Sequence, residues 1–163
     1  MKRILIILTT VVATTVFSMS NAAAQYNTFS TGNTMAQVTI GLPRSSMGER
    51  RILPLSATIE HGISDFGYAG SLGLGGILEY SNYDNTANVV LEAIMNYHCF
   101  LSPKFELHAK LGIGYWNELE TGAALSHSLF VGTMYFFDDL VALMVEAGYS
   151  YVSSFRAGIA INF

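Results

Sequence analysis

The stretch FELHAKLGIGY, Phe105 to Tyr115, decides the fold. Its odd-numbered residues are apolar or aromatic, and its even-numbered residues are charged, polar or glycine. Successive side chains of a β-strand point to opposite faces, so this strict alternation predicts a strand with one apolar and one polar face. The apolar face carries Phe105, Leu107, Ala109, Leu111, Ile113 and Tyr115, and the polar face carries Glu106, His108, Lys110, Gly112 and Gly114.

The same alternation recurs in seven other stretches of the chain. These are residues 36–42, 55–63, 71–80, 88–99, 127–137, 141–151 and 155–163. The expected turns are 64–70, 102–104 and 138–139, and the expected longer polar connectors are 43–54, 81–86 and 117–124. Eight strands of about 9–11 residues, linked in chain order, predict an all-β fold that is an antiparallel up-and-down barrel.

Residues 1–24 have the parts of a cleaved secretory signal peptide. Lys2 and Arg3 give a positive start, a mostly apolar run follows from Ile4 to Ser20, and Ala22-Ala23-Ala24 offers the small residues of a cleavage site. A retained membrane anchor is the alternative, although Thr and Ser dilute the apolar run. We expect the mature protein to be one barrel domain, residues 25–163.

Charge is scarce in this chain. Charged residues make up 12% of it, whereas a soluble domain carries about 25%. The net charge is negative, which argues against a nucleic acid partner. Cys99 is the only cysteine, so the sequence excludes an internal disulfide and a zinc cluster, and we expect no metal or cofactor. After the signal, no apolar run reaches the roughly 18 residues of a membrane-spanning helix.

The scarcity of charge also indicates which face of the barrel points outward. A soluble, lipocalin-like barrel that binds an apolar ligand has the same alternation, but its charged face meets water and its apolar face lines a cavity. Here the polar faces are dominated by Gly, Ser and Asn, which suit a crowded interior better than a solvated exterior. We therefore expect the apolar faces to contact lipid and the strands to cross a membrane, as a closed barrel can.

Aromatic residues cluster near the ends of the apolar faces. Such residues form girdles at both boundaries of an outer-membrane barrel. The predicted girdle is Tyr80, Tyr97, Phe105, Tyr115, Tyr135, Phe137, Tyr149, Tyr151 and Phe163. With both chain ends on the periplasmic side, Tyr97 and Phe105 lie near that boundary, whereas Tyr80 and Tyr115 lie near the outer one.

The polar faces bring charged residues into the predicted interior. The predicted lumenal polar cluster is Glu60, Glu79, Glu92, Lys110, Glu146 and Arg156. Glu106, His98 and His108 share these faces. An eight-stranded barrel is filled by its own side chains, so we expect a packed, non-conducting core rather than a proton relay or a metal site. Because five carboxylates face two permanent cations, at least one glutamate should be protonated or pair with a histidine.

Ser126-His127-Ser128 is the one candidate for nucleophilic catalysis. Adjacent strand residues point to opposite faces, so His127 cannot easily serve as a base for either serine, and no acid partner is evident. We therefore expect no enzyme and no catalytic residues. An outer-membrane lipid-modifying enzyme, a lipopolysaccharide deacylase or acyltransferase, is the alternative.

The chain resembles the small eight-stranded outer-membrane β-barrels of the OmpA/OmpX type, and among them the short barrels of Bacteroidetes-like bacteria. The stretches that carry the resemblance are PLSATIEHGI (Pro54 to Ile63), GSLGLGGILEYSNY (Gly70 to Tyr83), LGIGYW (Leu111 to Trp116) and the terminal INF. The resemblance implies that Phe163, an aromatic residue ending the last strand, is the signal read by the barrel-assembly machinery.

These observations predict an integral barrel in the outer membrane of a Gram-negative bacterium. Its expected role is envelope structure, surface contact or adhesion, and its expected partners are outer-membrane lipid, lipopolysaccharide and the assembly machinery. We expect a monomer.

Overall fold

The computed structural model describes residues 28–43, 50–67, 70–83, 86–118 and 122–163. The predicted signal peptide lies outside these residues and stays a prediction. Among the described residues, no helix is long and apolar enough to cross a membrane.

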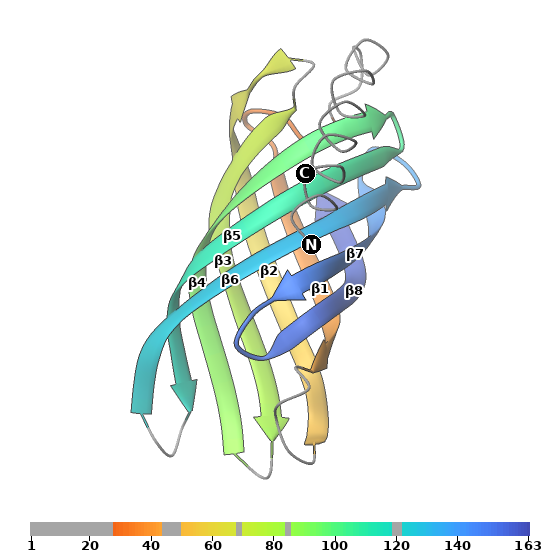
Figure 1. Ribbon diagram of the computed structural model, residues 1–163. Coiled ribbons are helices and arrows are strands. Elements are labelled where there is room, and N and C mark those ends of the chain that lie inside the picture. Colours follow the sequence, from red (N-terminus) through yellow and green to blue (C-terminus); the bar gives the residue numbers. More distant parts are fainter. Residues whose placement is uncertain (1–27, 44–49, 68–69, 84–85, 119–121) are drawn as a thin grey trace, which may run out of the picture.

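Eight antiparallel strands form a closed barrel, in which each strand pairs with the next and β8 pairs with β1 (Figure 1). The strands are β1 (Thr34–Pro43), β2 (Arg50–Asp65), β3 (Ser71–Tyr83), β4 (Thr86–Ser102), β5 (Phe105–Glu118), β6 (Gly122–Phe136), β7 (Val141–Tyr149) and β8 (Ser153–Asn162). This confirms the predicted fold class. Alternating side chains explain the closure, because each strand offers one face to the interior and one to the outside.

Most strands are longer than the predicted 9–11 residues, and the expected connectors are correspondingly shorter. β4 has 17 residues and β2 has 16. Most of the connectors expected at 81–86 and 117–124 are strand instead, and β2 already starts at Arg50. The prediction was wrong here because it followed apolar alternation, whereas backbone pairing continues into polar segments that need no apolar face.

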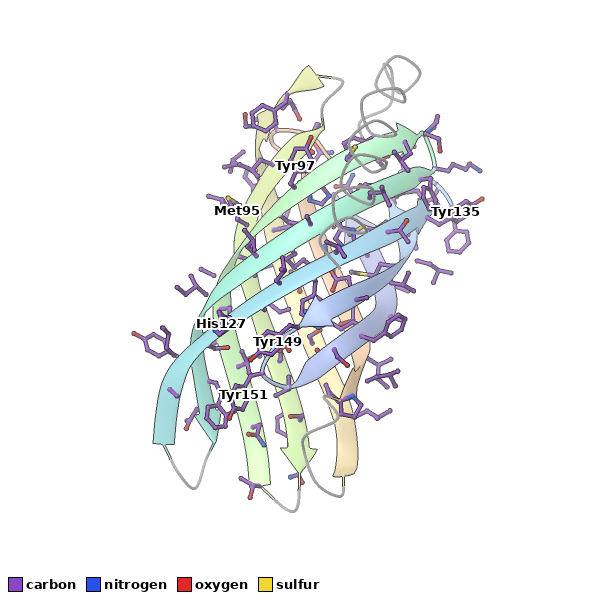
Figure 2. All side chains as sticks on the ribbon, in the orientation of Figure 1. Met95, Tyr97, His127, Tyr135, Tyr149 and Tyr151 are labelled. Atoms are coloured by element: carbon purple, nitrogen blue, oxygen red, sulfur yellow. The ribbon has the colours of Figure 1, made fainter. Side chains whose placement is uncertain are left out.

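The apolar faces point outward and the polar faces inward. Leu111 and Ile159 are 48% and 46% exposed, whereas Lys110 and Glu146 are each 1% exposed. The lipocalin-like alternative requires the opposite arrangement and is therefore wrong. In Figure 2 the aromatic side chain of Tyr135 projects outward from the wall.

The two ends of the barrel are called the even end, at the top of Figure 1, and the uneven end, at the bottom. At the even end lie the turns after β2, β4 and β6, together with the end of β8. At the other end the β7–β8 hairpin turns back at Ser150–Val152, short of the ends of β3 to β6 (Figure 1). The barrel wall is therefore raised on one side of this end and low on the other.

Asp138 organises the turn between β6 and β7. Its Oδ1 accepts hydrogen bonds from the backbone N–H groups of Val141 at 2.7 Å and Leu140 at 2.9 Å. These bonds, the Val141 bond foremost, lower the pKa of the Asp138 carboxyl below its ordinary value. The ionised side chain thus fixes the start of β7 through local geometry alone.

Arginine substitutions at two depths test the outward orientation. Leu111 lies on β5 between Phe105 and Tyr115, at the middle of the apolar wall. Leu125 pairs with Tyr115, in the group of aromatic residues nearer the uneven end. We expect Leu111→Arg to lower the free energy of unfolding in lipid vesicles by about 2–4 kcal/mol and Leu125→Arg by about 0–1 kcal/mol, because the cost of a cation depends on depth. Equal losses measured by urea titration would contradict a hydrocarbon-facing wall.

Candidate functional site

All six residues of the predicted lumenal polar cluster lie inside the barrel, and none is more than 2% exposed. Glu106, His98 and His108 are also buried there. Glycines on the same faces make the room that these side chains need. A Cβ on Gly132 would lie 2.7 Å from His108 Nε2 and 2.8 Å from Glu146 Cγ. Glycine at this position therefore lets two charged side chains pack against the inner wall.

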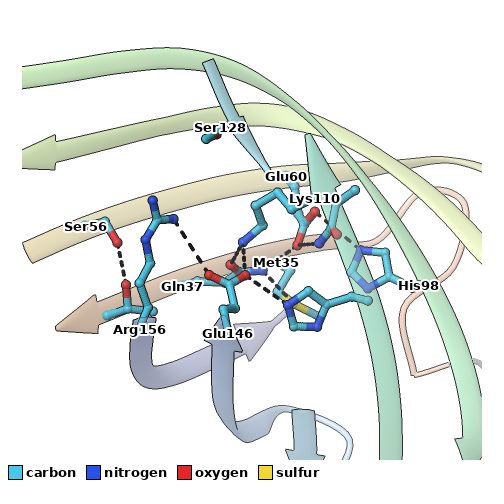
Figure 3. A network of polar contacts seen from close by, with 12 residues as sticks. Met35, Gln37, Ser56, Glu60, His98, Lys110, Ser128, Glu146 and Arg156 are labelled. Atoms are coloured by element: carbon cyan, nitrogen blue, oxygen red, sulfur yellow. Dashed lines mark hydrogen bonds and ion pairs between the residues drawn. The ribbon is translucent and has the colours of Figure 1, made fainter. Parts of the chain in front are cut away.

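Lys110 lies at the centre of the interior. Its Nζ donates to Glu146 Oε1 at 2.6 Å and to Gln37 Oε1 at 2.8 Å (Figure 3). Gln37 Nε2 in turn donates to Glu60 Oε1 at 2.5 Å. These bonds connect β5, β7, β1 and β2 across the barrel. Gln37, which the sequence analysis did not single out, carries the connection because its amide both donates and accepts.

Two histidines extend this network toward the even end of the barrel. His98 Nδ1 lies 2.6 Å from Glu106 Oε1, and His98 Nε2 lies 3.4 Å from Glu60 Oε2. His108 Nε2 lies 2.9 Å from Glu146 Oε1. Three of the five buried glutamates therefore contact a histidine, which is one of the two outcomes expected from the charge imbalance.

Arg156 joins the part of the interior nearer the uneven end to the same network. It forms an ion pair with Glu79, its Nε donates to Ser153 Oγ at 2.9 Å, and its guanidinium carbon lies 3.7 Å from the centre of the Phe130 ring. Its Nη1 lies 3.7 Å from Glu146 Oε2. A continuous chain of charged and polar side chains thus runs from Glu79 to Glu106.

Glu92 lies apart from this chain. Its carboxylate accepts hydrogen bonds from Ser126 Oγ at 2.5 Å and from Ser128 Oγ. No described Lys, Arg or His forms an ion pair with it. Gly112, on the intervening strand, leaves the space through which Glu92 reaches both serines.

Ser126 and Ser128 therefore do have an acid partner, Glu92, although none was expected from the sequence. Alternation along one strand does not indicate contacts between β4 and β6, which lie on either side of β5. The opposed placement of His127 is as expected: it lies on the outer wall, where its ring centre is 5.4 Å from that of Tyr149 (Figure 2). Ser126 and Ser128 thus contact Glu92 but not His127, so these residues do not form a Ser–His–acid triad.

An apolar cap, which the sequence analysis missed, closes the even end of the interior. Phe29 is fully buried, and its ring centre lies 4.3 Å from that of His98. Ser71 Oγ donates to Phe29 O at 2.8 Å, and Asn162 Nδ2 donates to Thr28 O at 2.5 Å. The buried cluster around it comprises Phe29, Met35, Phe100, Met134, Phe136, Ala142, Met144 and Ala160. The segment before β1 has no alternation, so no sequence pattern pointed to it.

A second cap, smaller than the first, lies at the uneven end. The rings of Trp116 and Tyr151 stack with centres 3.7 Å apart, and both pack against buried Val90 and Val152. Trp116 Nε1 donates to Asn88 Oδ1 at 3.0 Å. The prediction of Tyr151 as a girdle residue is therefore wrong. The strand alternation ends at Tyr149, and the turn after it directs the Tyr151 ring toward Trp116 instead of outward.

The other predicted girdle residues lie on the outer wall. Tyr149 is half-buried, and the rest are 37–67% exposed: Tyr80, Tyr97, Phe105, Tyr115, Tyr135, Phe137 and Phe163. Tyr135 and Phe137 pack edge to face, with ring centres 5.7 Å apart. No group of three or more described His, Cys, Asp or Glu side chains is arranged to hold a metal ion.

No protein-family model matches the chain, and no curated protein matches it. Solved structures do share its architecture. A de novo designed transmembrane β-barrel has a TM-score of 0.59 at 20% identity, over 82% of this chain and 97% of that one. The chain therefore has the fold of a transmembrane β-barrel. Two further similar structures come from Pseudomonas aeruginosa. The N-terminal β-barrel domain of OprF has a TM-score of 0.53 at 13% identity, covering 82% and 98% of the two chains. The outer membrane protein OprG has a TM-score of 0.54 at 9% identity, covering 85% and 99%.

Methionine substitutions of two lysines measure the contribution of the buried network to the barrel. Lys110→Met leaves Glu146 without its closest cation, so we expect a loss of about 3–5 kcal/mol in the free energy of unfolding. Lys104 is exposed in the β4–β5 turn. Lys104→Met should therefore change stability by less than about 0.5 kcal/mol. Similar unfolding midpoints for both variants in urea would show that Lys110 is not stabilised by its partners.

Alanine substitutions of two phenylalanines test the Phe29 cap. Phe29→Ala removes a fully buried ring and should destabilise the barrel by about 3–5 kcal/mol. It should also speed hydrogen exchange at the imidazole Cε1 of His98, measured by mass spectrometry, because water gains access to the ring. Phe66, which is 52% exposed in the β2–β3 turn, supplies the control. Unchanged exchange at His98 in folded Phe29→Ala protein would contradict the capping role.

Proposed function

We propose that this barrel is an outer-membrane protein of a Gram-negative bacterium, of the OmpA/OmpX type, and that it makes surface contacts outside the cell. In this proposal it contributes to envelope structure and adhesion, is not an enzyme and does not conduct solutes. The observation that carries the proposal is an unpaired strand edge on the raised part of the wall.

The free edge belongs to the first half of β6. On one side, β6 pairs with β5 along its whole length, up to Glu118↔Gly122. On the other side, pairing with β7 begins only at Leu129↔Tyr149. Residues 122–128 of β6 therefore have no neighbour on the β7 side within the described chain.

Such an edge can accept another strand. No described strand pairs with this part of β6 on its open side, so an extended segment of another protein can pair with the backbone N–H and C=O groups there. Leu125, which is 69% exposed, offers an apolar contact beside the edge. Leu125 pairs with Tyr115, in the aromatic group nearer the uneven end, so Gly122 to Ala124 extend beyond that aromatic group. In this proposal that end of the barrel faces the outside of the cell.

The two caps support a non-conducting interior. The Phe29 cluster lies at one end of the interior, and the Trp116–Tyr151 stack lies at the other. Between them, oppositely charged side chains contact one another directly, and buried ion pairs of this kind fill space that an aqueous channel would need.

The expected partners remain part of the proposal. Outer-membrane lipid and lipopolysaccharide would surround a monomeric barrel between the aromatic residues. The barrel-assembly machinery would read Phe163, whose backbone N–H and C=O both bond to Thr34 at 2.8 Å, at the seam where β8 meets β1. An assembly signal at this position would lie on the strand pair that closes the barrel.

Lysine substitutions on the free edge test the proposed surface contact. Lysines on an edge strand oppose the addition of another strand, so Ala123→Lys with Leu125→Lys should reduce attachment of producing bacteria to protein-coated surfaces several-fold. In the wild-type barrel in nanodiscs, alternate amides of residues 122–128 should also exchange with deuterium faster than the amides of 129–135, which have partners on both sides.

The matched control places two lysines on paired strands of the same raised wall. Asn82 and Ala87 pair with each other on β3 and β4. Asn82→Lys with Ala87→Lys adds the same charge but leaves the β6 edge unchanged, so attachment should stay at the wild-type level. Equal attachment by the two double variants would overturn the edge as the contact site.

A further inference from the structure

A hollow of about 540 Å³ lies on the outer wall, across β4 to β8. None of the side chains that point into it from the outer face is charged. These are Tyr97, Cys99, Leu107, Ala109, Val131, Thr133, Val145, Ala147 and Phe155. Inward-facing His108, Gly132 and Glu146 complete the lining. Its volume falls within the range of small-molecule binding sites, yet it offers almost no polar group to a ligand.

The strand register explains why the wall is hollow here. One cross-strand row runs Tyr97, Ala109, Val131, Ala147 and Phe155, each residue paired with the next. Large aromatic residues stand at its two ends, and two alanines flank a valine between them. Side chains that pair across neighbouring strands lie side by side on one face. The row is therefore a shallow trough closed at both ends.

Bulkier rows border the trough. The row on the side of the uneven end is Met95, Leu111, Leu129 and Tyr149. On the side of the even end, the row that contains Leu107 comes first, and beyond it lie Phe105, Tyr135, Leu143 and Ile159. Four of the bordering and end residues, Met95, Tyr97, Tyr135 and Tyr149, are labelled in Figure 2. The trough is thus a groove in the wall and not a general narrowing of the barrel.

The depth and length of the trough indicate its occupant. It runs from Tyr97, in the aromatic group nearer the even end, to Phe155, beside the β7–β8 turn, so it lies obliquely within the hydrocarbon band. Five strands span four gaps of about 4.8 Å, which makes the row about 19 Å long. One leaflet of the hydrocarbon core is about 15 Å thick, so an extended acyl chain of a lipid has a comparable length.

We propose that this trough binds one acyl chain of a phospholipid, which lies along the row from Tyr97 to Phe155. The chain fills the space above Ala109 and Ala147 and contacts the bordering leucines and aromatic rings. Burial of this apolar surface against a fitted chain holds the lipid more tightly than the convex remainder of the wall holds its neighbours. The site recognises hydrocarbon and makes no demand on the headgroup.

Tryptophan substitutions of two alanines test the site. Ala147→Trp fills the trough, whereas Ala57→Trp adds the same ring to the outer face of β2, where Ala57 is exposed between Val38 and Leu78. Full-length mature protein in mild detergent is titrated with palmitoyl-oleoyl phosphatidylethanolamine, and bound lipid is counted by native mass spectrometry. We expect one retained lipid in the wild type and in Ala57→Trp, and an affinity at least about tenfold lower in Ala147→Trp.

Folding of each variant is checked by the migration of unboiled and boiled samples on a gel. Ala147→Leu, with a side chain already common on this wall, provides a second variant that partly fills the trough and should weaken retention to an intermediate degree. Three results would overturn the proposal: no lipid retained by the wild type, equal retention by Ala147→Trp and Ala57→Trp, or wild-type dimers that Ala147→Trp separates. The last result would assign the trough to a second copy of the chain.

Discussion

The whole structure depends on one constraint: the wall of the barrel is a single sheet, so each strand residue faces either hydrocarbon or the interior. In a bilayer every backbone N–H and C=O must be satisfied within the protein, and closing β8 onto β1 achieves this over the part of the wall where each strand pairs on both sides. The same closure confines all inward side chains to a space that they must fill themselves. Lipid contact and interior packing are therefore decided together, residue by residue.

Burial of so many charges in that space is tolerable only because they meet one another. A lone buried carboxylate or ammonium loses several kcal/mol of hydration, and a close partner offsets this loss. Lys110 contacts Glu146, Arg156 contacts Glu79, and His98 lies between Glu106 and Glu60. Among the described residues, the side chains that donate to Glu92 are the hydroxyls of Ser126 and Ser128, which makes it chemically distinct from the other four glutamates.

The outer wall shows the same constraint from the lipid side. Its residues need only be apolar, so their sizes are free to vary, and the register then decides which sizes stand side by side. Ala109 and Ala147 lie in one row although they are far apart in sequence, and the trough results from that coincidence. Beyond the aromatic residues at the uneven end, outward side chains need not be apolar. There β6 continues past the start of its pairing with β7, and no described strand pairs with its edge.

Local alternation by itself determined the number and order of the strands and the faces that side chains within them occupy, although not where each strand ends. It sufficed for Lys110, Glu146 and Leu111 because a period of two residues is a property of the backbone, independent of distant contacts. Only the tertiary structure decided which inward residues meet, because the stagger of eight strands sets those distances. These contacts are the hydrogen bond between Gln37 and Lys110, the bonds from Ser126 and Ser128 to Glu92, the stacking of Tyr151 on Trp116, and the packing of Phe29 against His98.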